Sequence, residues 1–306
     1  MSPLETYLAM IEDRRRVDAY RAAIEATVRP GDVVLDLGCG TGLFSIFAAR
    51  AGARKVYAVE QGPIAQVATE VVRANGLEET VEVLRGHSTE IAPPERADVL
   101  VADALGQFGV DSRLATRLAD ARERWLVPGA RLVPRRLELW IAPVRWPGLI
   151  GRMQEAGRRL GVRLEMLDDL ARSTVGSIDA GDVRVEVGHR RFGDAIELGI
   201  LHAGSTSRVA ARWESAEEAG LEEAHGLAGG FRAELADGIC LDHSPQGGLV
   251  WSLPIFPFDR SHPTARMDAW VEHRDASGHA WGVRSSGGSE TRAAALGFAP
   301  RDHRPT

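Results

Sequence analysis

A short stretch that runs from Val33 to Ser45, VVLDLGCGTGLFS, decides the fold. Its first five residues are apolar except for one aspartate, and three glycines stand among the next five. The run that follows, LFSIFAAR, carries apolar residues at helical spacing. The stretch therefore predicts a buried strand, a tight turn and a helix.

The glycines of this turn indicate a ligand-binding loop, although not a dinucleotide-binding one. A dinucleotide fingerprint has the form G-x-G-x-x-G. Here the glycines are Gly38, Gly40 and Gly42, so the third comes one residue early. Because glycine has no side chain, a ligand can approach the backbone amides of such a turn. We therefore expect a cofactor other than NAD.

Two acidic residues narrow the choice of cofactor. Asp36 stands just before the turn, where a carboxylate can receive an ammonium group, and Glu60 ends the next strand-like run, KVYAVE. A carboxylate at the end of that strand can accept hydrogen bonds from both hydroxyls of a ribose. S-adenosylmethionine has both a ribose and an amino-acid end, so we expect it as the cofactor and S-adenosylhomocysteine as the product.

Composition limits the class of protein and its partners. The chain has 306 residues and a formal charge of −6, and its apolar runs fall short of the roughly 20 residues that a membrane span needs. We expect a soluble, cytoplasmic protein for which nucleic acid is an unfavourable partner and a cationic molecule a favourable one. The two cysteines are too few for a disulfide framework, and the histidines show no metal-ligand spacing, so no metal is expected.

The pattern along the chain predicts four regions. Strand-like and helical runs alternate from residue 31 to 138, which indicates a parallel sheet with helical crossovers. Residues 1–30 read as amphipathic helices, which the family resemblance described below implies would cover the cofactor, and residues 139–285 read as short antiparallel strands with one helical insertion. Residues 286–306 are rich in Gly, Ser, Arg and Pro and are expected to form a flexible tail.

Several segments carry a more specific pattern, namely MIEDRRRVDAYR, GLFSIFAARAGARKVYAVE, RGHSTEI, ERWLVPGARLVPRRLELWIAP and HGLAGGFRAELADGICLDHSP. With them the chain resembles the protein arginine methyltransferase family, in a divergent bacterial form. The resemblance implies an α/β fold, in which a Rossmann-like class I methyltransferase domain precedes an antiparallel β-barrel-like domain with a helical insertion. In the family this insertion is a dimerisation arm, so a homodimer is expected.

The resemblance also implies which residues bind the cofactor. Met10 would pack against it, Arg16 would bind its carboxylate, and Ser88 lies in the segment that holds the adenine. The full expected set is Met10, Arg16, Asp36, Gly38, Cys39, Gly40, Gly42, Glu60, Gln61 and Ser88. Thr89 stands where the family has a glutamate.

The expected acceptor site departs from the family. Two family glutamates become Asp103 and Asp111 on a loop that is one residue shorter, and a threonine-histidine-tryptophan loop keeps only its tryptophan, Trp251. These three are the candidate catalytic residues, although Asp111 could instead cap the helix that follows it. An aspartate lacks one methylene of a glutamate, so the acceptor is expected to differ from histone-like protein arginine.

Several functions remain open at this stage. The expected activity is N-methylation of a small guanidine or amine, an amino acid or a peptide in a bacterial secondary pathway such as natural product biosynthesis. O-methylation of a peptide or a small-molecule carboxylate or hydroxyl is the alternative within the same class. A catalytically silent scaffold that binds S-adenosylmethionine is the alternative from another class.

Overall fold

The computed structural model describes residues 3–145, 148–164, 175–178, 186–220, 223–244, 251–263, 266–275, 277–285 and 291–294. The chain divides into two compact units. The first comprises residues 1–138, 195–205 and 231–250, and the second comprises residues 139–194, 206–230 and 251–306. The segments 195–205 and 231–250 thus belong to the first unit, although the sequence pattern groups them with the second.

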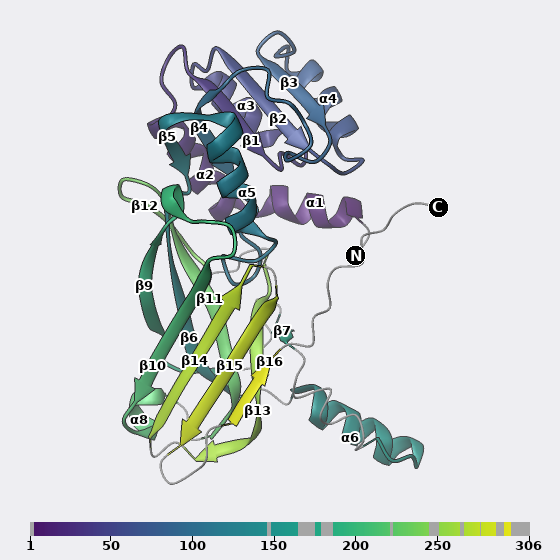
Figure 1. The fold of residues 1–306 in the computed structure, drawn as a ribbon. Coiled ribbons are helices and arrows are strands. Elements are labelled where there is room, and N and C mark those ends of the chain that lie inside the picture. Colours follow the sequence, from purple (N-terminus) through teal and green to yellow (C-terminus); the bar gives the residue numbers. More distant parts are fainter. Residues whose placement is uncertain are drawn as a thin grey trace. The chain divides into compact units, whose positions relative to one another are not determined.

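The first unit is built on a parallel sheet (Figure 1). Its five strands follow the order β3-β2-β1-β4-β5 and are β1 (Val33–Leu37), β2 (Lys55–Glu60), β3 (Val81–Arg85), β4 (Ala97–Ala102) and β5 (Leu126–Val133). Its helices are α1 (Pro3–Glu12), α2 (Arg14–Thr27), α3 (Leu43–Arg50), α4 (Ala65–Ala74) and α5 (Leu114–Asp120), followed by the π-helical turn η1 (Ala121–Trp125). Every residue of β1 is buried, as expected for a central strand between helical layers.

The strand order places a ligand site at one edge of this sheet. From β1 the chain builds outward through β2 and β3, and it then returns to add β4 on the other side of β1. Ligands of open α/β sheets bind outside the carboxyl ends of the strands at such a reversal. Asp36, Glu60 and Asp103 lie at the carboxyl ends of β1, β2 and β4.

The remaining elements of the first unit follow later in the chain. They are the short helix η3 (Leu198–Ile200) and the strand β12 (Ile239–Asp242), together with parts of β6 (Arg136–Arg145), β9 (Arg191–Glu197) and β11 (Glu223–Ala236). Arg122 of η1 donates to the backbone carbonyls of Gly199 and Leu201, at 2.8 Å each, and so ties η3 to the parallel-sheet region. The Val133–Pro134 peptide bond is cis.

The second unit is a β structure with one longer helix. One sheet has the order β10-β14-β15-β16, with β10 (Thr206–Trp213), β14 (Met267–Arg274), β15 (Gly278–Ser285) and β16 (Thr291–Ala294). The other follows β7-β13-β11-β6-β8, with β7 (Gly176–Ile178), β13 (Leu253–Pro263) and β8 (Glu186–Val187). Its helices are α6 (Gly148–Leu160) and α8 (Ala216–Ala219).

Three features of the second unit are described here: the apolar core of one sheet, the helix α6 and the strand β16. Trp140, Ala228 and Ile255 belong to its buried apolar core. The expected helical insertion is present as α6, but this helix ends at Leu160 and residues 161–164 are not helical, because Gly161 adopts a left-handed φ of 66°. The rest of the expected insertion, residues 165–173, lies outside the described residues. Residues 291–294, expected in a flexible tail, instead form β16, because pairing with β15 satisfies their backbone hydrogen bonds; residues 295–306 are not described.

Candidate functional site

The glycine loop is held against the end of β2. The backbone N–H groups of Gly38 and Cys39 both donate to the carbonyl of Val59, at 2.9 and 3.0 Å. Gly38, Gly40 and Gly42 have φ values of 81°, 55° and 80°, a left-handed conformation that favours glycine. The sequence therefore requires glycine at these positions for backbone geometry, and burial raises the pKa of the Cys39 thiol between them.

Glu60 is fixed by the loops on either side of it. Its Oε2 accepts a hydrogen bond from the N–H of Gly40 at 3.1 Å, and its Oε1 accepts one from the N–H of Gly62 at 2.7 Å. The carboxylate predicted to bind a ribose is therefore oriented by two backbone donors, one in the glycine loop and one in the segment after β2. Gln61, the next residue, is exposed.

Asp36 is buried beneath the loop. The hydroxyl of Ser45 on α3 donates to its Oδ2 at 2.6 Å. The pKa of Asp36 is raised to about 7, chiefly by burial and also by the carboxylates of Asp103 and Glu60, which together outweigh the lowering effect of the hydrogen bond from Ser45. A cationic group beside Asp36 would therefore favour its ionised form.

Arg16 and Asp103 form a buried ion pair across the site. Arg16 Nη1 lies 3.3 Å from Asp103 Oδ2, and both side chains are less than a tenth exposed. Asp13 caps the start of α2 by accepting from the N–H of Arg16 at 3.1 Å, which sets the register of the helix. The guanidinium also lies over the ring of Phe44, 5.2 Å from its centre.

The electrostatics of Asp103 reflect this pairing. Burial raises its pKa to about 6, although Arg16 and the hydroxyl of Tyr20 lower it. Its Oδ1 atom is buried and has no hydrogen-bond partner among the described residues. Tyr20 stacks on Phe44 with ring centres 4.6 Å apart and donates to the carbonyl of Ala102 at 3.1 Å, so it packs α2 against α3 and the end of β4.

Asp111 lies within its own loop. Its Oδ2 accepts from the N–H of Phe108 at 2.7 Å, and a Cβ atom at Gly106 would lie 2.4 Å from its Cβ. The N-cap of α5 is Arg113, which makes no side-chain capping bond, and the N–H of Leu114 donates to the backbone carbonyl of Asp111 at 3.1 Å. Ser112 and Arg113, which lie between Asp111 and α5, adopt left-handed φ values of 59° and 57°. Both a catalytic and a helix-capping role for Asp111 stay predictions.

The segment after β3 contains Ser88, which is buried. The Ser88 carbonyl accepts from Trp125 Nε1 at 3.1 Å and also from Arg124. Thr89 is exposed, and its hydroxyl lies 2.7 Å from Nδ1 of His87.

Met10 is half-buried on α1, and the same helix carries a residue that the sequence analysis missed. A Cβ atom at Gly40 would lie 3.4 Å from the Tyr7 ring, so Tyr7 packs over the glycine loop. Its pKa is raised by burial and by the charges of Glu60 and Cys39. The spacing of three residues between Tyr7 and Met10, which places both on one helical face, could have identified it.

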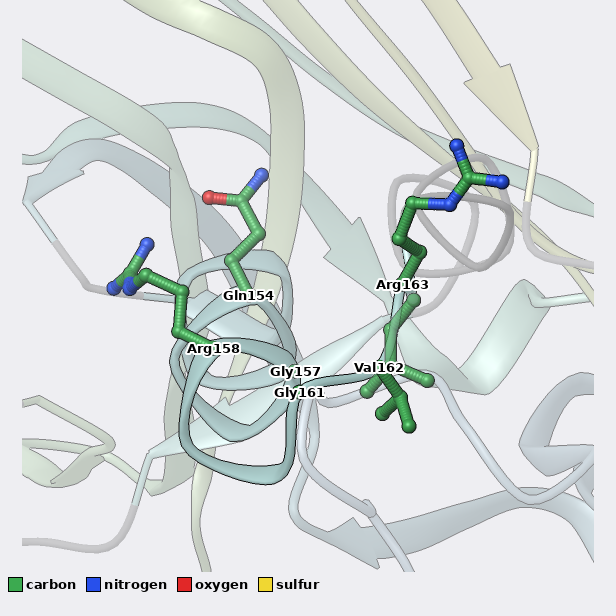
Figure 2. A pocket seen from close by; sticks show the side chains of 7 residues that line it. Gln154, Gly157, Arg158, Gly161, Val162 and Arg163 are labelled. Carbon is green, nitrogen blue, oxygen red and sulfur yellow. The ribbon is translucent and has the colours of Figure 1, made fainter.

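Trp251 belongs to the second unit, whereas the other candidate residues belong to the first. It is half-buried within its unit. The second unit also contains a hollow at the carboxyl end of α6, and none of the predicted site residues lines it (Figure 2). Its lining comprises Gln154, Gly157, Arg158, Gly161, Val162, Arg163 and Leu164.

Known proteins resemble this chain in sequence over part of its length. The family model of ribosomal protein L11 methyltransferase (PrmA) matches residues 21–123. A probable protein arginine N-methyltransferase 6 of Arabidopsis thaliana is 42% identical over 140 residues, which cover 45% of this chain and 32% of that protein. Protein arginine N-methyltransferase 6 of Danio rerio is 36% identical over 175 residues, which cover 56% of this chain and 50% of that protein. The matches thus span about a third to a half of these relatives.

Solved structures match the whole fold. A chain from the Trypanosoma brucei PRMT1 enzyme-prozyme heterotetrameric complex with AdoHcy has a TM-score of 0.79 at 20% identity, over 94% of this chain and 97% of that one. Arabidopsis thaliana protein arginine methyltransferase 10, in an open conformation, has a TM-score of 0.72 at 20% identity, over 94% and 96%. The predicted fold class is therefore confirmed. In sequence and in fold, the chain resembles the protein arginine methyltransferases, with a class I methyltransferase domain followed by a barrel-like β domain.

Proposed function

We propose that this chain is an S-adenosylmethionine-dependent methyltransferase that methylates a cationic nitrogen acceptor. One observation carries the proposal. Asp36, Glu60 and the Arg16–Asp103 pair come together at the carboxyl ends of β1, β2 and β4, where sheets of this class bind ligands. The names of the sequence relatives, which are protein arginine N-methyltransferases, support it.

The residues present fit the cofactor. Glu60 is oriented by two backbone donors and has the acceptor capacity to bind both ribose hydroxyls. Asp36 is a buried carboxyl whose pKa of about 7 would fall beside the ammonium group of the cofactor. Arg16 offers a guanidinium fork to a carboxylate. When bound, the cofactor supplies a methyl group on a positively charged sulfur.

The acceptor chemistry is inferred from the two aspartates. Asp103 has a buried Oδ1 with no hydrogen-bond partner among the described residues, and this atom can accept from an N–H of the acceptor. Two carboxylates would attract a cation and repel a carboxylate, which favours nitrogen as the acceptor atom. The cationic acceptor would give up one N–H proton to a carboxylate of the site or to water, which frees a nitrogen lone pair. Catalysis then consists of positioning that lone pair in line with the methyl group and excluding other water. Candidate acceptors are a small guanidine or amine, an amino acid or a peptide.

One observation favours a second candidate function, that of a scaffold that binds the cofactor without transferring its methyl group. Both aspartates already have partners within the protein, since Asp103 pairs with Arg16 and Asp111 accepts from Phe108. In addition, one of the matched structures is a complex of an enzyme with a prozyme. O-methylation remains a third candidate that the same assays distinguish.

A homodimer through α6 is part of the proposal. Leu160 ends this helix and is 65% exposed, and Val162 follows it and is 49% exposed, beside the hollow of Figure 2. Such exposed apolar side chains at the end of a helix suit burial against a second copy. Light scattering on wild type and on Leu160→Glu tests this, because a dimer formed through α6 would dissociate in the variant. An unchanged mass would reject this interface.

Within the described residues, none of the helices combines the length and apolar character of a membrane span. We propose a cytoplasmic location and a role in natural product biosynthesis as the setting of the activity.

The function is tested in two steps. Calorimetry with S-adenosylhomocysteine tests the site itself, and no binding would reject every version of the proposal. Mass spectrometry of a metabolite and peptide extract, incubated with the protein and labelled S-adenosylmethionine, then identifies the acceptor. Binding without transfer would favour the scaffold, whereas label that survives base treatment would exclude a methyl ester.

A further inference from the structure

The segment 86–91 leaves β3 beside the proposed ribose site and is attached there. The N–H of Gly86 donates to the carbonyl of Glu60 at 2.9 Å, so the segment begins next to the residue proposed to hold the ribose. Within the segment, the N–H groups of Glu90 and Ile91 both donate to the carbonyl of His87, at 2.9 and 3.2 Å. A base attached to a ribose at Glu60 would extend along this segment.

The other attachment of the segment comes from η1. Arg124 Nη1 donates to the carbonyl of Ile91 at 2.8 Å, and Arg124 Nη2 donates to the carbonyl of Ser88. The fully buried Trp125 donates to the same Ser88 carbonyl through Nε1 at 3.1 Å. Two neighbouring side chains of η1 therefore hold two carbonyls of one short segment.

Arg124 is itself oriented by the helix that precedes it. Asp120 at the end of α5 receives two hydrogen bonds from the guanidinium, from Nε to Oδ1 at 2.7 Å and from Nη2 to Oδ2 at 2.8 Å. A bidentate pair of this kind fixes the plane of the guanidinium. The remaining donors then point in set directions, which a lysine ammonium cannot reproduce.

The backbone path of this segment contributes to the surface beside the proposed ribose site. The hydroxyl of Thr89 is engaged with His87, and Thr89 itself is exposed. The course of the backbone between Gly86 and Ile91 therefore sets the shape of the surface beside the ribose site. That course depends on the contacts from Arg124.

We propose that Arg124, oriented by Asp120 and assisted by Trp125, is a positioning residue that shapes the binding site for the purine base of the cofactor. The proposal rests on the proposed function, because it takes Glu60 as the ribose site. In this role Arg124 does not touch the cofactor. It acts by holding the carbonyls of Ser88 and Ile91 away from the base and fixing the path of the chain between them.

Calorimetry with S-adenosylhomocysteine and with adenosine tests the proposal on the full chain. In Arg124→Met the dissociation constants of both ligands should rise by the same factor, on the order of tenfold for the loss of charge-assisted hydrogen bonds. Arg124→Lys and Asp120→Asn should give smaller rises, because each keeps part of the network. Arg54→Met is the matched control, since Arg54 also pairs with a carboxylate, that of Glu95, but is exposed.

The binding stoichiometry separates positioning from a merely structural role. A positioning role raises the dissociation constant while every molecule still binds one ligand. A structural role lowers the fraction of molecules that bind and leaves the dissociation constant unchanged, and this result would overturn the proposal. Unchanged binding in Arg124→Met, or an equal loss in Arg54→Met, would also overturn it. If the wild-type chain binds neither ligand, the proposed function fails and this inference fails with it.

Discussion

Replacing Arg16 by methionine tests the buried ion pair at the centre of the site. The variant keeps most of the side-chain volume but leaves Asp103 without its cationic partner. At the observed separation of 3.3 Å between Arg16 Nη1 and Asp103 Oδ2, two unit charges attract by about 5 kcal/mol at an effective dielectric constant of about 20. Removing one partner of a buried pair typically costs about 3–5 kcal/mol. We therefore expect a loss of this size in the free energy of unfolding at pH 8.

The dependence of this loss on pH identifies its cause. In the wild type the pKa of Asp103 is raised from 3.8 to about 6, chiefly by burial. A raised carboxyl pKa contributes stability that is full below the unfolded-state value and is lost as the pH rises through the folded-state value. Without Arg16 the pKa of Asp103 rises further, so the variant continues to lose stability above pH 6. The difference in the free energy of unfolding between wild type and Arg16→Met should therefore be small at pH 4 and should increase up to pH 8.

Urea unfolding followed by tryptophan fluorescence at pH 4, 6 and 8 measures this difference. Asp13, Tyr20 and Asp36 also lie near the pair, but they are present in both proteins, so their effects are largely common to the two unfolding curves. Arg14→Met is the control, because Arg14 is an exposed arginine on the same helix. A stability difference that does not change with pH would refute the buried ion pair. So would an equal effect of Arg14→Met.

Three further predictions concern binding and turnover. Glu60→Ala should raise the dissociation constant of S-adenosylhomocysteine about ten- to a hundredfold, because ribose hydroxyls lose a charged partner worth about 1.5–3 kcal/mol; unchanged affinity in calorimetry would reject the ribose role. Arg16→Ala should weaken S-adenosylmethionine more than adenosine, since only the former carries a carboxylate, and competition binding compares the two. In methyl-transfer assays, Asp103→Asn should abolish most turnover without weakening cofactor binding, whereas Asp111→Asn should be milder because asparagine can still accept from Phe108. Near-full turnover of Asp103→Asn would favour O-methylation.

The sequence predicts the backbone elements around the candidate site well where local rules determine the structure. Apolar periodicity and left-handed glycines specify the strand, turn and helix around Gly38–Gly42. The position of Glu60 follows from the same alternation, because a parallel strand places its last residue at the ligand edge of the sheet. The helical insertion is predicted by its periodicity and begins where expected.

The features that could not be predicted from the sequence depend on contacts between residues that are distant in the chain or on irregular backbone. The pairing of Arg16 with Asp103 joins the start of α2 to the end of β4, and no local pattern specifies that contact. The hydrogen bond from Phe108 to Asp111 depends on the path of an irregular loop, including left-handed residues other than glycine that residue preference does not predict. Strand β16 was missed because a four-residue edge strand has too little periodicity to distinguish it from a tail.

The Arg16–Asp103 pair also links the two halves of the proposed reaction. The same guanidinium is the proposed partner of the cofactor carboxylate and the observed partner of Asp103. A carboxylate that approaches Arg16 competes for its donors and weakens its hold on Asp103, which then has more capacity to accept from the methyl acceptor. On this reasoning the cofactor prepares the acceptor site, so acceptor affinity should be higher in the presence of S-adenosylhomocysteine than in its absence.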